Sequence, residues 1–395
     1  MLSEKSSDVV RATLPAVAGA IGDITPLFYE KLFAAHPELL RDLFNRGNQA
    51  NGSQRQALAG SIAKFATYLV EQPDTRPDVM LGRIAHKHAA LGVTADQYEI
   101  VHKYLFEAIV EVLGEAVTPE VAAAWDEVYW LMANALIAIE ARLYAEAGTP
   151  DGDVWRTYRV TGRIEETDEV TTFFVEPVDG RPVPSARPGQ FVSVQVELPD
   201  GARQIRQYSL TGPAEGGLRF AVKRVADDPS FPGEVSHQLH TRAGVGHELR
   251  ISAPFGDVVL DESSENPVLL ASAGIGCTPM SGMLAALAGS GTQRQVVVAH
   301  ADRSEADDAF RTDLRQWSAK LPDAVSYVWY EDGAAGEARE GRMDLAGIEL
   351  PEGLTAYLCG PLPFLKAVRT QLLDKGVPAA NIHYEMFGPD LFLAN

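Results

Sequence analysis

The chain has 395 residues, of which 46% are hydrophobic and 22% are charged. This length suggests two to three domains, and the composition excludes collagen-like, coiled-coil and wholly disordered proteins. The 54 acidic and 34 basic residues give a net charge of −20, which opposes binding to nucleic acid and to anionic membrane surfaces. Two cysteines, Cys277 and Cys359, are too few for a disulfide framework, so we expect a cytoplasmic protein.

Two apolar stretches could be mistaken for targeting or membrane segments. Residues 12–22 follow a segment whose charges cancel, and Pro15 interrupts them, so we interpret them as the first helix of a domain. Residues 128–139 are broken by Asn134 and are shorter than the ~20 residues that a membrane helix needs. We therefore expect no membrane span.

The pattern of apolar and polar residues changes at two places along the chain. Up to about residue 147, apolar positions recur at helical spacing, as in Tyr29, Leu32 and Phe33, which predicts an all-α region. Residues 148–153 combine two glycines, a proline and two aspartates, a composition typical of a linker.

Beyond the linker, strand patterns dominate. Short runs rich in Val, Thr, Phe and Tyr, such as residues 158–161, 191–196 and 218–222, predict an antiparallel β-barrel or sandwich. From about residue 266, apolar runs alternate with helical stretches, which indicates a parallel α/β sheet. We thus predict three domains: all-α over residues 1–147, an antiparallel β-barrel over 151–262 and α/β over 263–395.

Two histidines stand out in the first domain. His86 and His88 are two residues apart in a helical stretch, so they point to nearly opposite faces. The interior stripe contains Leu81, Ile84, His88 and Leu91, whereas His86 shares its face with Gly82, Arg83 and Ala90. An interior histidine is more often a hydrogen-bonded core residue than a metal ligand, and the periodicity alone leaves both possibilities open.

Further residues favour a metal site. The stretches FNRGNQ (residues 44–49) and NGSQR (residues 51–55) follow Tyr29, and His88 comes 34 residues after Gln54 (88 minus 54). Together these features resemble the globin haem pocket of the flavohaemoglobins. The resemblance implies one haem b, with His88 as the proximal iron ligand. His86 departs from the family pattern, but since it faces away we expect no change of chemistry.

The same resemblance implies partners on both sides of the iron. Glu140, with Tyr98 as its companion, would accept a hydrogen bond from the second imidazole nitrogen of His88. An acid in the apolar run 136–140 is costly without a partner, although Glu140 could instead lie at the rim near Arg142. On the distal side, Tyr29 would donate to bound dioxygen. Three further residues, Gln54, Leu58 and Phe44, would assist it or limit access.

A second motif concerns a flavin. In the strand-like run 206–209, alternation places Arg206 and Tyr208 on one face, which suits a ligand with a pyrophosphate and a flat ring; an ordinary surface strand is the alternative. The run resembles the RxYS motif of the ferredoxin reductase superfamily, and RPGQF, GEVS and PFGD (residues 187–191, 233–236 and 254–257) follow the family order. The resemblance implies one FAD, bound by Gln190, Arg206, Gln207, Tyr208, Ser209, Val222, Lys223, Glu234, Val235 and Ser236.

A third motif, GIGCTPM over residues 274–280, follows the apolar run 268–271. Its glycines let the backbone approach a phosphate, and we expect Thr278 as the N-cap of a helix with Pro279 in its first turn. It resembles the reductase-superfamily version of a nicotinamide site and is not the GxGxxG fingerprint. The implied contacts are Gly274, Gly276, Cys277, Thr278, Pro279, Cys359, Gly360, Pro361, Glu385, Phe387 and Gly388.

Three details of this site follow. Cys359 is expected to be a buried thiol, because hydride transfer needs no protein nucleophile. Phe387 is the candidate gate between flavin and nicotinamide. Asp302 favours the ribose diol of NADH, whereas Arg303 with Ser304 could accept the 2′-phosphate of NADPH; the family preference leads us to expect NADH.

The three motif sets cover the chain in the order of a flavohaemoglobin. The resemblance implies an oxygen-binding nitric oxide dioxygenase, in which NAD(P)H reduces FAD, FAD reduces the haem, and NO and O2 become nitrate in defence against NO. An alternative is a haem and flavin reductase or oxidase acting on hydroperoxides, ferric iron or O2. A haem-based gas sensor is less favoured, because the output module would be an electron-transfer pair. We expect a monomer whose partners are small molecules.

Overall fold

The computed structural model describes residues 2–149, 152–225, 233–333 and 336–388. Pro150 and Asp151 of the predicted linker lie outside these ranges. Two compact units are present, one comprising residues up to 155 with 197–206, the other residues 156–196 with 207–387. The described helices include none that is long and apolar enough to cross a membrane.

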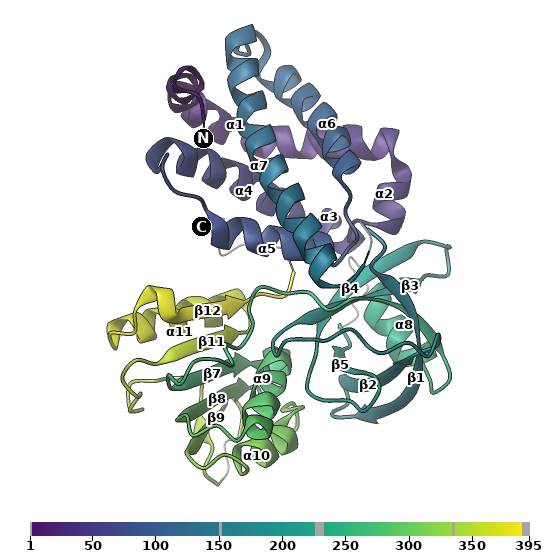
Figure 1. The fold of residues 1–395 in the computed structure, drawn as a ribbon, viewed down its shortest axis with the longest axis vertical. Coiled ribbons are helices and arrows are strands. Elements are labelled where there is room, and N and C mark those ends of the chain that lie inside the picture. The colour runs from purple at the N-terminus through teal and green to yellow at the C-terminus, as the bar shows by residue number, and fades with distance from the viewer. Residues whose placement is uncertain (1, 150–151, 226–232, 334–335, 389–395) are drawn as a thin grey trace. The chain divides into compact units, whose positions relative to one another are not determined.

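The first unit is helical, as predicted. Its helices are α1 (Glu4–Ala35), α2 (Pro37–Asp42), α3 (Arg46–Ala50), α4 (Ser53–Glu71), α5 (Asp78–Ala89), α6 (Ala95–Leu113) and α7 (Pro119–Glu146), with the 3-10 turn η1 (Gly114–Ala116). Local chemistry sets their starts: Ser3 caps α1 through its side chain, Thr94 forms a capping box on α6, and Thr118 caps α7. Figure 1 shows α1, α6 and α7 in the helical part.

The core of this unit follows helical spacing. Ile24, Phe28 and Leu32 of α1 are fully or almost fully buried, and they pack with Leu105 and Ala108 of α6. Burial of one apolar stripe per helix supplies most of the stabilisation, because short helices are marginal on their own.

After the helices the chain forms an antiparallel sheet, as predicted, and most of this sheet belongs to the second unit. Its strands are β1 (Trp155–Glu165), β2 (Val170–Pro177), β3 (Phe191–Glu197), β4 (Arg203–Ser209), β5 (Leu218–Lys223) and β6 (Glu248–Ser252), in the order β4-β3-β6-β1-β2-β5. Cross-strand pairs such as Phe173 with Phe220 fix the register. Helix α8 (Glu234–Arg242) buries Val235 and Leu239 in the same core.

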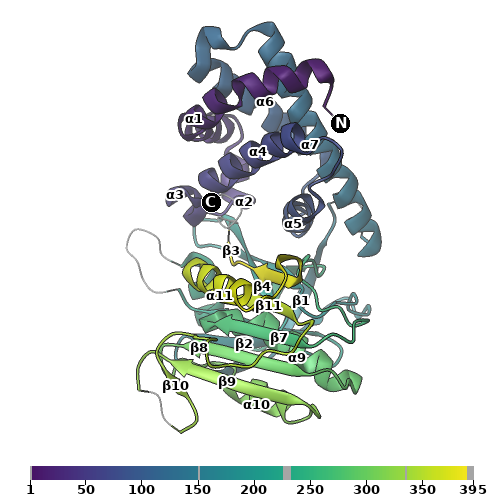
Figure 2. The ribbon, with the colours of Figure 1, turned by 90° about the vertical axis from the view of Figure 1, so that its left-hand side faces the viewer.

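A six-stranded parallel sheet follows, again as predicted. Its strands are β7 (Val268–Ala273), β8 (Val296–Asp302), β9 (Ala324–Tyr330), β10 (Arg339–Glu340), β11 (Thr355–Cys359) and β12 (Ile382–Glu385), in the order β10-β9-β8-β7-β11-β12. The helical segments are η2 (Gly274–Gly276), α9 (Cys277–Ser290), α10 (Arg311–Ser318), α11 (Leu362–Asp374) and η3 (Ala379–Asn381). Figures 1 and 2 show α11 on one face of this sheet, with α9 and α10 on the other.

Direct side-chain and backbone contacts join the antiparallel sheet to the parallel sheet. Arg219 of β5 is 9% exposed and pairs with Asp313 of α10 at 2.5 Å. Ser281 of α9 donates to the backbone carbonyl of Thr211 over 3.0 Å. A Cβ at Gly282 would lie 2.5 Å from the Leu210 carbonyl oxygen, so α9 touches the segment that follows β4.

Candidate functional site

His88 lies on α5 beside residues from α6 and α7. Its Nδ1 atom is 2.9 Å from Oε1 of Glu140 and 2.9 Å from the hydroxyl of Tyr98, and that hydroxyl donates to the same Glu140 oxygen over 2.6 Å. Glu140 is 3% exposed, so its charge depends on these two donors. The rim alternative for Glu140 does not occur, because Arg142 pairs instead with Glu146.

This arrangement decides which imidazole nitrogen of His88 is available. A carboxylate only accepts hydrogen bonds, so the proton of a neutral His88 ring is on Nδ1, and Nε2 has a lone pair for a metal. Burial, reinforced by the charge of Glu140, raises the pKa of Tyr98, which stays a neutral donor. The His88 side chain is 34% exposed, unlike an ordinary core histidine.

Tyr29 on α1 belongs to a second cluster, which consists of packed apolar and aromatic side chains. It is 6% exposed, and the ring of Phe44 meets it edge-on at 5.9 Å between centroids. Leu58 packs against the same cluster from α4. Burial raises the pKa of the Tyr29 phenol, while the Gln49 side chain and the charge of Arg55 act in the opposite direction. Tyr29 is therefore a neutral hydrogen-bond donor.

Gln49, a residue that sequence reasoning did not name, has its side-chain amide beside Tyr29, and Gln54 stays a prediction. Gln49 approaches the Tyr29 hydroxyl closely enough to affect its pKa, yet its buried Nε2 atom has no hydrogen-bond partner among the described residues. A buried amide donor without a partner is costly unless a ligand accepts from it. Gln49 is part of the same FNRGNQ stretch, so the motif contained the signal.

The burial of α5 differs in part from the expectation. His86 is half-buried, but Arg83 and Ala90, which we placed on the same outward face, are 7% and 0% exposed. The helix is thus covered on more than the stripe that contains His88.

The predicted flavin residues lie on β4 and on segments of the antiparallel sheet around it. Tyr208 stacks on Phe220 with ring centroids 5.6 Å apart and planes at 23°, while Ser209 is buried. The Arg206 guanidinium donates to the Ile205 carbonyl over 2.8 Å. Arg206, Gln207 and Tyr208 are all half-buried, so their polar groups remain within reach of a ligand.

The other predicted flavin residues belong to neighbouring segments. The side chain of Gln190 accepts from the Arg187 amide at 2.8 Å, and its backbone carbonyl accepts from Leu210. Val222 and Lys223 end β5, where Lys223 pairs with Glu169 at 3.4 Å. Glu234, Val235 and Ser236 form the first turn of α8, whose N-terminal amides favour an anion.

The GIGCTPM turn and the Cys359 turn meet at the carboxyl ends of neighbouring strands. Strands β7 and β11 pair in parallel, and a Cβ at Gly276 would lie 2.2 Å from the Cys359 carbonyl oxygen. A Cβ at Gly360 would lie 2.7 Å from the Phe364 ring. Backbone atoms leave no room for a side chain at Gly276, whereas at Gly360 the Phe364 ring would have to move. This sheet edge is where open α/β sheets bind ligands.

The start of α9 corrects one prediction. The helix begins at Cys277 with Gly276 as its N-cap, and Thr278 is its second residue, not the cap. The reason is the 3-10 turn η2, which leads directly into the helix, so the Thr278 hydroxyl donates back to the Ile275 carbonyl over 2.8 Å. Pro279 lies in the first turn, as expected.

The last predicted residues complete this sheet edge. Cys359 pairs with Glu385 across β11 and β12, and burial raises the pKa of the Cys359 thiol, which fits a structural thiol and not a nucleophile. Phe387 follows β12 and is 46% exposed. Pro361 caps α11, and Gly388 is the last residue described, with φ of 102°.

Sequence reasoning missed a buried polar cluster at the end of β8. His300 is 1% exposed; its Nδ1 is 2.9 Å from the Ser272 hydroxyl, and its Nε2 is 3.5 Å from both Asp302 and Asp308. Burial alone would raise the pKa of Asp302, but the hydrogen bond and charge of His300 lower it overall. Tyr330 donates to Asp308 over 2.9 Å. Burial of such groups requires these mutual contacts.

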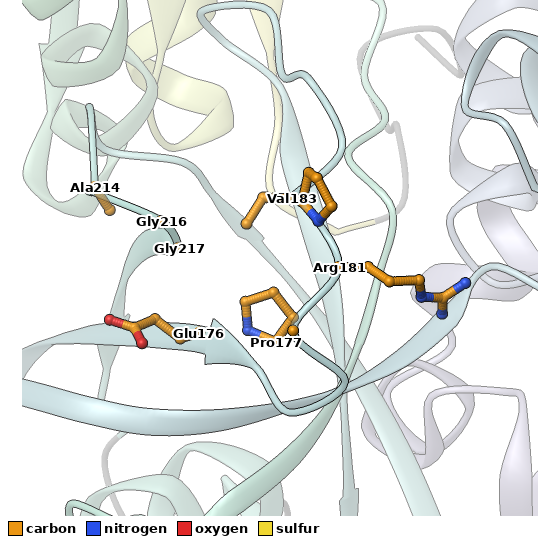
Figure 3. Close-up of a pocket in the computed structure, with 9 residues that line it drawn as sticks. Glu176, Pro177, Arg181, Val183, Ala214, Gly216 and Gly217 are labelled. Atoms are coloured by element: carbon orange, nitrogen blue, oxygen red, sulfur yellow. The ribbon is translucent and has the colours of Figure 1, made fainter.

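A further cavity of about 480 Å³ lies on the antiparallel sheet (Figure 3). It is lined by Glu176 and Pro177 at the end of β2, the loop 180–183 and the turn 214–217. It shares no residue with the predicted sites.

The residues present fit the three groups that the motifs imply. His88 has a fixed Nδ1 and an available Nε2, and the unpaired Nε2 of Gln49 can serve a polar ligand. The close approach of Gly276 to Cys359 makes a narrow backbone turn that suits a dinucleotide. The half-buried Arg206 and Tyr208 suit a pyrophosphate and a flat ring.

Comparison with known proteins gives independent results. Residues 27–136 match the globin family, and residues 270–370 match the oxidoreductase NAD-binding domain. A flavohemoprotein of Rhizobium meliloti is 39% identical, covering 99% of this chain and 100% of the relative. One from Bordetella pertussis is 42% identical, covering 98% of this chain and 99% of the relative.

Solved structures of flavohaemoglobins and of their domains are also similar to this chain. A Malassezia yamatoensis flavohemoglobin with bound FAD and heme superposes with a TM-score of 0.90 at 38% identity, covering 98% of this chain and 100% of the other. The FAD/NAD-binding domain of a nitric oxide dioxygenase from Vibrio cholerae is 40% identical with a TM-score of 0.56. It covers 59% of this chain and 99% of that domain.

Proposed function

Because this chain belongs to the flavohaemoglobin family, we propose that it is a nitric oxide dioxygenase that holds haem, FAD and NAD(P)H and converts NO and O2 to nitrate. NAD(P)H is a two-electron donor and haem a one-electron acceptor, so the flavin is needed between them. The observation that carries the proposal is the contact of His88 with Glu140 and Tyr98, which leaves His88 Nε2 available.

The proximal residues would make His88 a strong electron donor. Haem, when bound, supplies the iron at which dioxygen and NO meet. The Glu140 carboxylate, 2.9 Å from Nδ1, draws the ring proton toward itself and gives the imidazole more anionic character. Tyr98 donates to the same oxygen over 2.6 Å and keeps that carboxylate in place.

The distal residues would favour dioxygen and exclude other ligands. Tyr29 would donate its hydroxyl to bound dioxygen, and Gln49, with Gln54 also available on α4, would provide an amide. Phe44 and Leu58, which pack against the Tyr29 cluster, would keep the pocket apolar. In a dry pocket a donor aimed at developing negative charge is more effective than in water.

The residues of the two sheets would supply electrons. Arg206 would hold the FAD pyrophosphate, Tyr208 and Ser209 its ring system, and the first turn of α8 an additional anion contact. The turns at Gly276 and Gly360 would receive the nicotinamide nucleotide. Phe387 would lie between the two rings until hydride transfer.

The charges at the end of β8 support NADH over NADPH. Arg303, which sequence reasoning named with Ser304 as a candidate for a 2′-phosphate, has its Nη2 atom 2.6 Å from Asp307 and 3.2 Å from Glu169. Those carboxylates would compete with a phosphate and repel it. We expect a higher kcat/KM for NADH, and equal values for the two nucleotides would contradict this assignment.

The reaction is tested by following NO loss, nitrate formed and NADH used in aerobic solution of the purified full-length protein. We expect NO and nitrate to match one to one, with one NADH oxidised for two NO consumed. Little NO loss, or products other than nitrate, would refute the proposal. Rapid NADH oxidation with hydroperoxides or ferric iron would then favour the reductase alternative.

The iron ligand is tested by His88→Ala, with His86→Ala as the matched control on the same helix. We expect His88→Ala to lose the normal haem absorption spectrum and His86→Ala to keep it. A normal haem spectrum in His88→Ala would show that the ligand assignment is wrong.

A further inference from the structure

Gln204 on β4 is a fully buried amide that joins this strand to the segment between α2 and α3. Its side chain is 0% exposed. Its Nε2 atom shares its N–H groups among three backbone carbonyls 3.1–3.2 Å away, those of Leu40, Arg41 and Phe44. Its Oε1 atom accepts from the backbone N–H of Arg46 over 3.1 Å. All of these residues belong to the first compact unit, and we refer to residues 40–46 as the corner segment.

Through these contacts one side chain caps two helices. Leu40 and Arg41 lie in the last turn of α2, where backbone carbonyls lack partners within the helix. Arg46 is the first residue of α3, and its N–H likewise has no partner within its helix. Helices of six and five residues are marginal on their own. Gln204 therefore stabilises the conformation of the corner segment.

The corner segment includes an aromatic residue of the proposed haem pocket. Phe44, whose carbonyl accepts from Gln204, has its ring 5.9 Å from that of Tyr29 and 5.3 Å from that of Phe33 between centroids. Both contacts are edge-on. A displacement of the corner segment would therefore change how Phe44 packs against Tyr29.

Gln204 also contacts the arginine that we assign to the flavin. Gln204 and Arg206 are two residues apart on β4, so their side chains lie on the same face. The Arg206 Nη1 atom is 3.4 Å from Oε1 of Gln204. A pyrophosphate bound to the Arg206 guanidinium would fix the position of that group, and with it the hydrogen bond to Gln204.

Two ion pairs flank Gln204, but they lie nearer the surface. Arg46 is 2.8 Å from Asp200, and Arg203 is 2.9 Å from Asp42. The side chains of Asp200 and Arg203 are 56% and 45% exposed, and exposed ion pairs contribute little to stability. The buried amide of Gln204 is therefore the stronger connection between β4 and the corner segment.

We infer that Gln204 is a positioning residue that couples flavin binding to ligand binding at the haem. FAD held by Arg206 fixes Gln204. Gln204 in turn holds the corner segment, so that Phe44 and Tyr29 close on the haem ligand. The inference rests on the proposed roles of Arg206 and Tyr29. Coupling between two binding sites is reciprocal, so a haem ligand that accepts from Tyr29 must strengthen FAD binding by the same factor.

The test uses the full-length ferric protein loaded with haem, with FAD either bound or removed, and cyanide as the haem ligand. The cyanide nitrogen can accept from Tyr29, and the shift of the haem absorption band gives the dissociation constant. We expect cyanide to bind roughly fivefold or more tightly with FAD than without it. A fluorescence titration of FAD, with and without cyanide, should give the same factor.

Gln204→Leu separates coupling from a purely structural role. A residue that only supported the fold would weaken cyanide binding equally with and without FAD, so the ratio of the two dissociation constants would not change. We expect that ratio to fall below about twofold in Gln204→Leu. Gln204→Glu, which keeps an accepting oxygen but has no N–H donor, should lower the ratio in the same way and serves if the leucine variant does not fold.

The matched control is Gln195→Leu on the adjacent strand β3. It removes a half-buried amide that accepts from Arg250 over 3.0 Å, and it should keep the parent ratio. A parent ratio near one, the parent ratio in either Gln204 variant, or loss of the ratio in Gln195→Leu would overturn the inference. Because these assays contain neither NO nor NADH, failure of the dioxygenase proposal would leave their result readable by itself.

Discussion

The charge on Glu140 should set the reduction potential of the haem iron. Glu140→Gln keeps the size of the side chain and an oxygen near His88 Nδ1, but it removes the negative charge that faces the ligand at 2.9 Å. Hydrogen bonds to charged groups contribute about 1.5–3 kcal/mol and neutral ones about 0.5–1.5 kcal/mol. The loss is therefore about 1–1.5 kcal/mol, which at 59 mV per tenfold for one electron is roughly 45–65 mV.

The sign follows from charge. Ferric haem has one more positive charge than ferrous haem, so an anionic partner of the ligand stabilises the ferric form. We expect Glu140→Gln to raise the midpoint potential by roughly 45–65 mV. An anaerobic spectroelectrochemical titration of the full-length protein, followed at the haem absorption band, measures it.

Two control variants separate this effect from general disturbance. Tyr98→Phe removes a donor but keeps the Glu140 carboxylate, so its shift should be smaller. Glu127→Gln alters another acid on α7, one that bonds to Ser3 at 2.7 Å and 2.8 Å, and should leave the potential unchanged. An unchanged or lowered potential in Glu140→Gln would refute the argument.

Three further outcomes are expected. Tyr29→Phe should speed dioxygen dissociation roughly ten- to a hundredfold in flash photolysis and lower NO turnover, because a hydrogen bond to a polar ligand is lost; an unchanged rate would remove Tyr29 from the pocket. Gly276→Ala should slow hydride transfer in stopped-flow assays, since its Cβ would meet the Cys359 carbonyl, whereas Gly289→Ala on α9 has open space and should leave the rate unaltered; equal rates would contradict this. Burial raises the pKa of both Cys277 and Cys359, so little thiolate forms and iodoacetamide at mildly alkaline pH should label neither until the protein is unfolded; labelling of the folded protein would show that burial is wrong.

The order of helical, antiparallel and parallel regions could be predicted from the sequence, because each has its own apolar period. The runs that indicated parallel strands, such as residues 268–271 and 355–358, lie within β7 and β11. The spacing of apolar residues alone does not locate the first residue of a helix to within one or two positions. The start of α9 depended on η2, a backbone turn that the residue types allowed but did not require.

Contacts between distant side chains were harder to predict. The sequence placed Glu140 near His88 only through resemblance, whereas its 3% exposure and two hydrogen bonds come from packing of α5, α6 and α7. Gln49 and Gln54 are the same residue type within six positions, and nothing in the local sequence indicated that the side chain of Gln49 approaches Tyr29. The His300 cluster was not predicted, because only Asp302 is near His300 in the sequence, whereas Ser272 lies on β7 and Asp308 follows β8.

Arg219 of β5 pairs with Asp313 of α10, and Ser281 donates to Thr211. These contacts have a consequence for how this enzyme family can diversify. These contacts hold the two sheets together, so the distance between their cofactor sites does not depend on the domain that precedes them in the chain. The pair of sheets can therefore be joined to a different electron acceptor without any change in the residues that serve hydride transfer. Expressed alone from residue 152 onward, it should reduce a soluble dye at the same rate per flavin as the full chain.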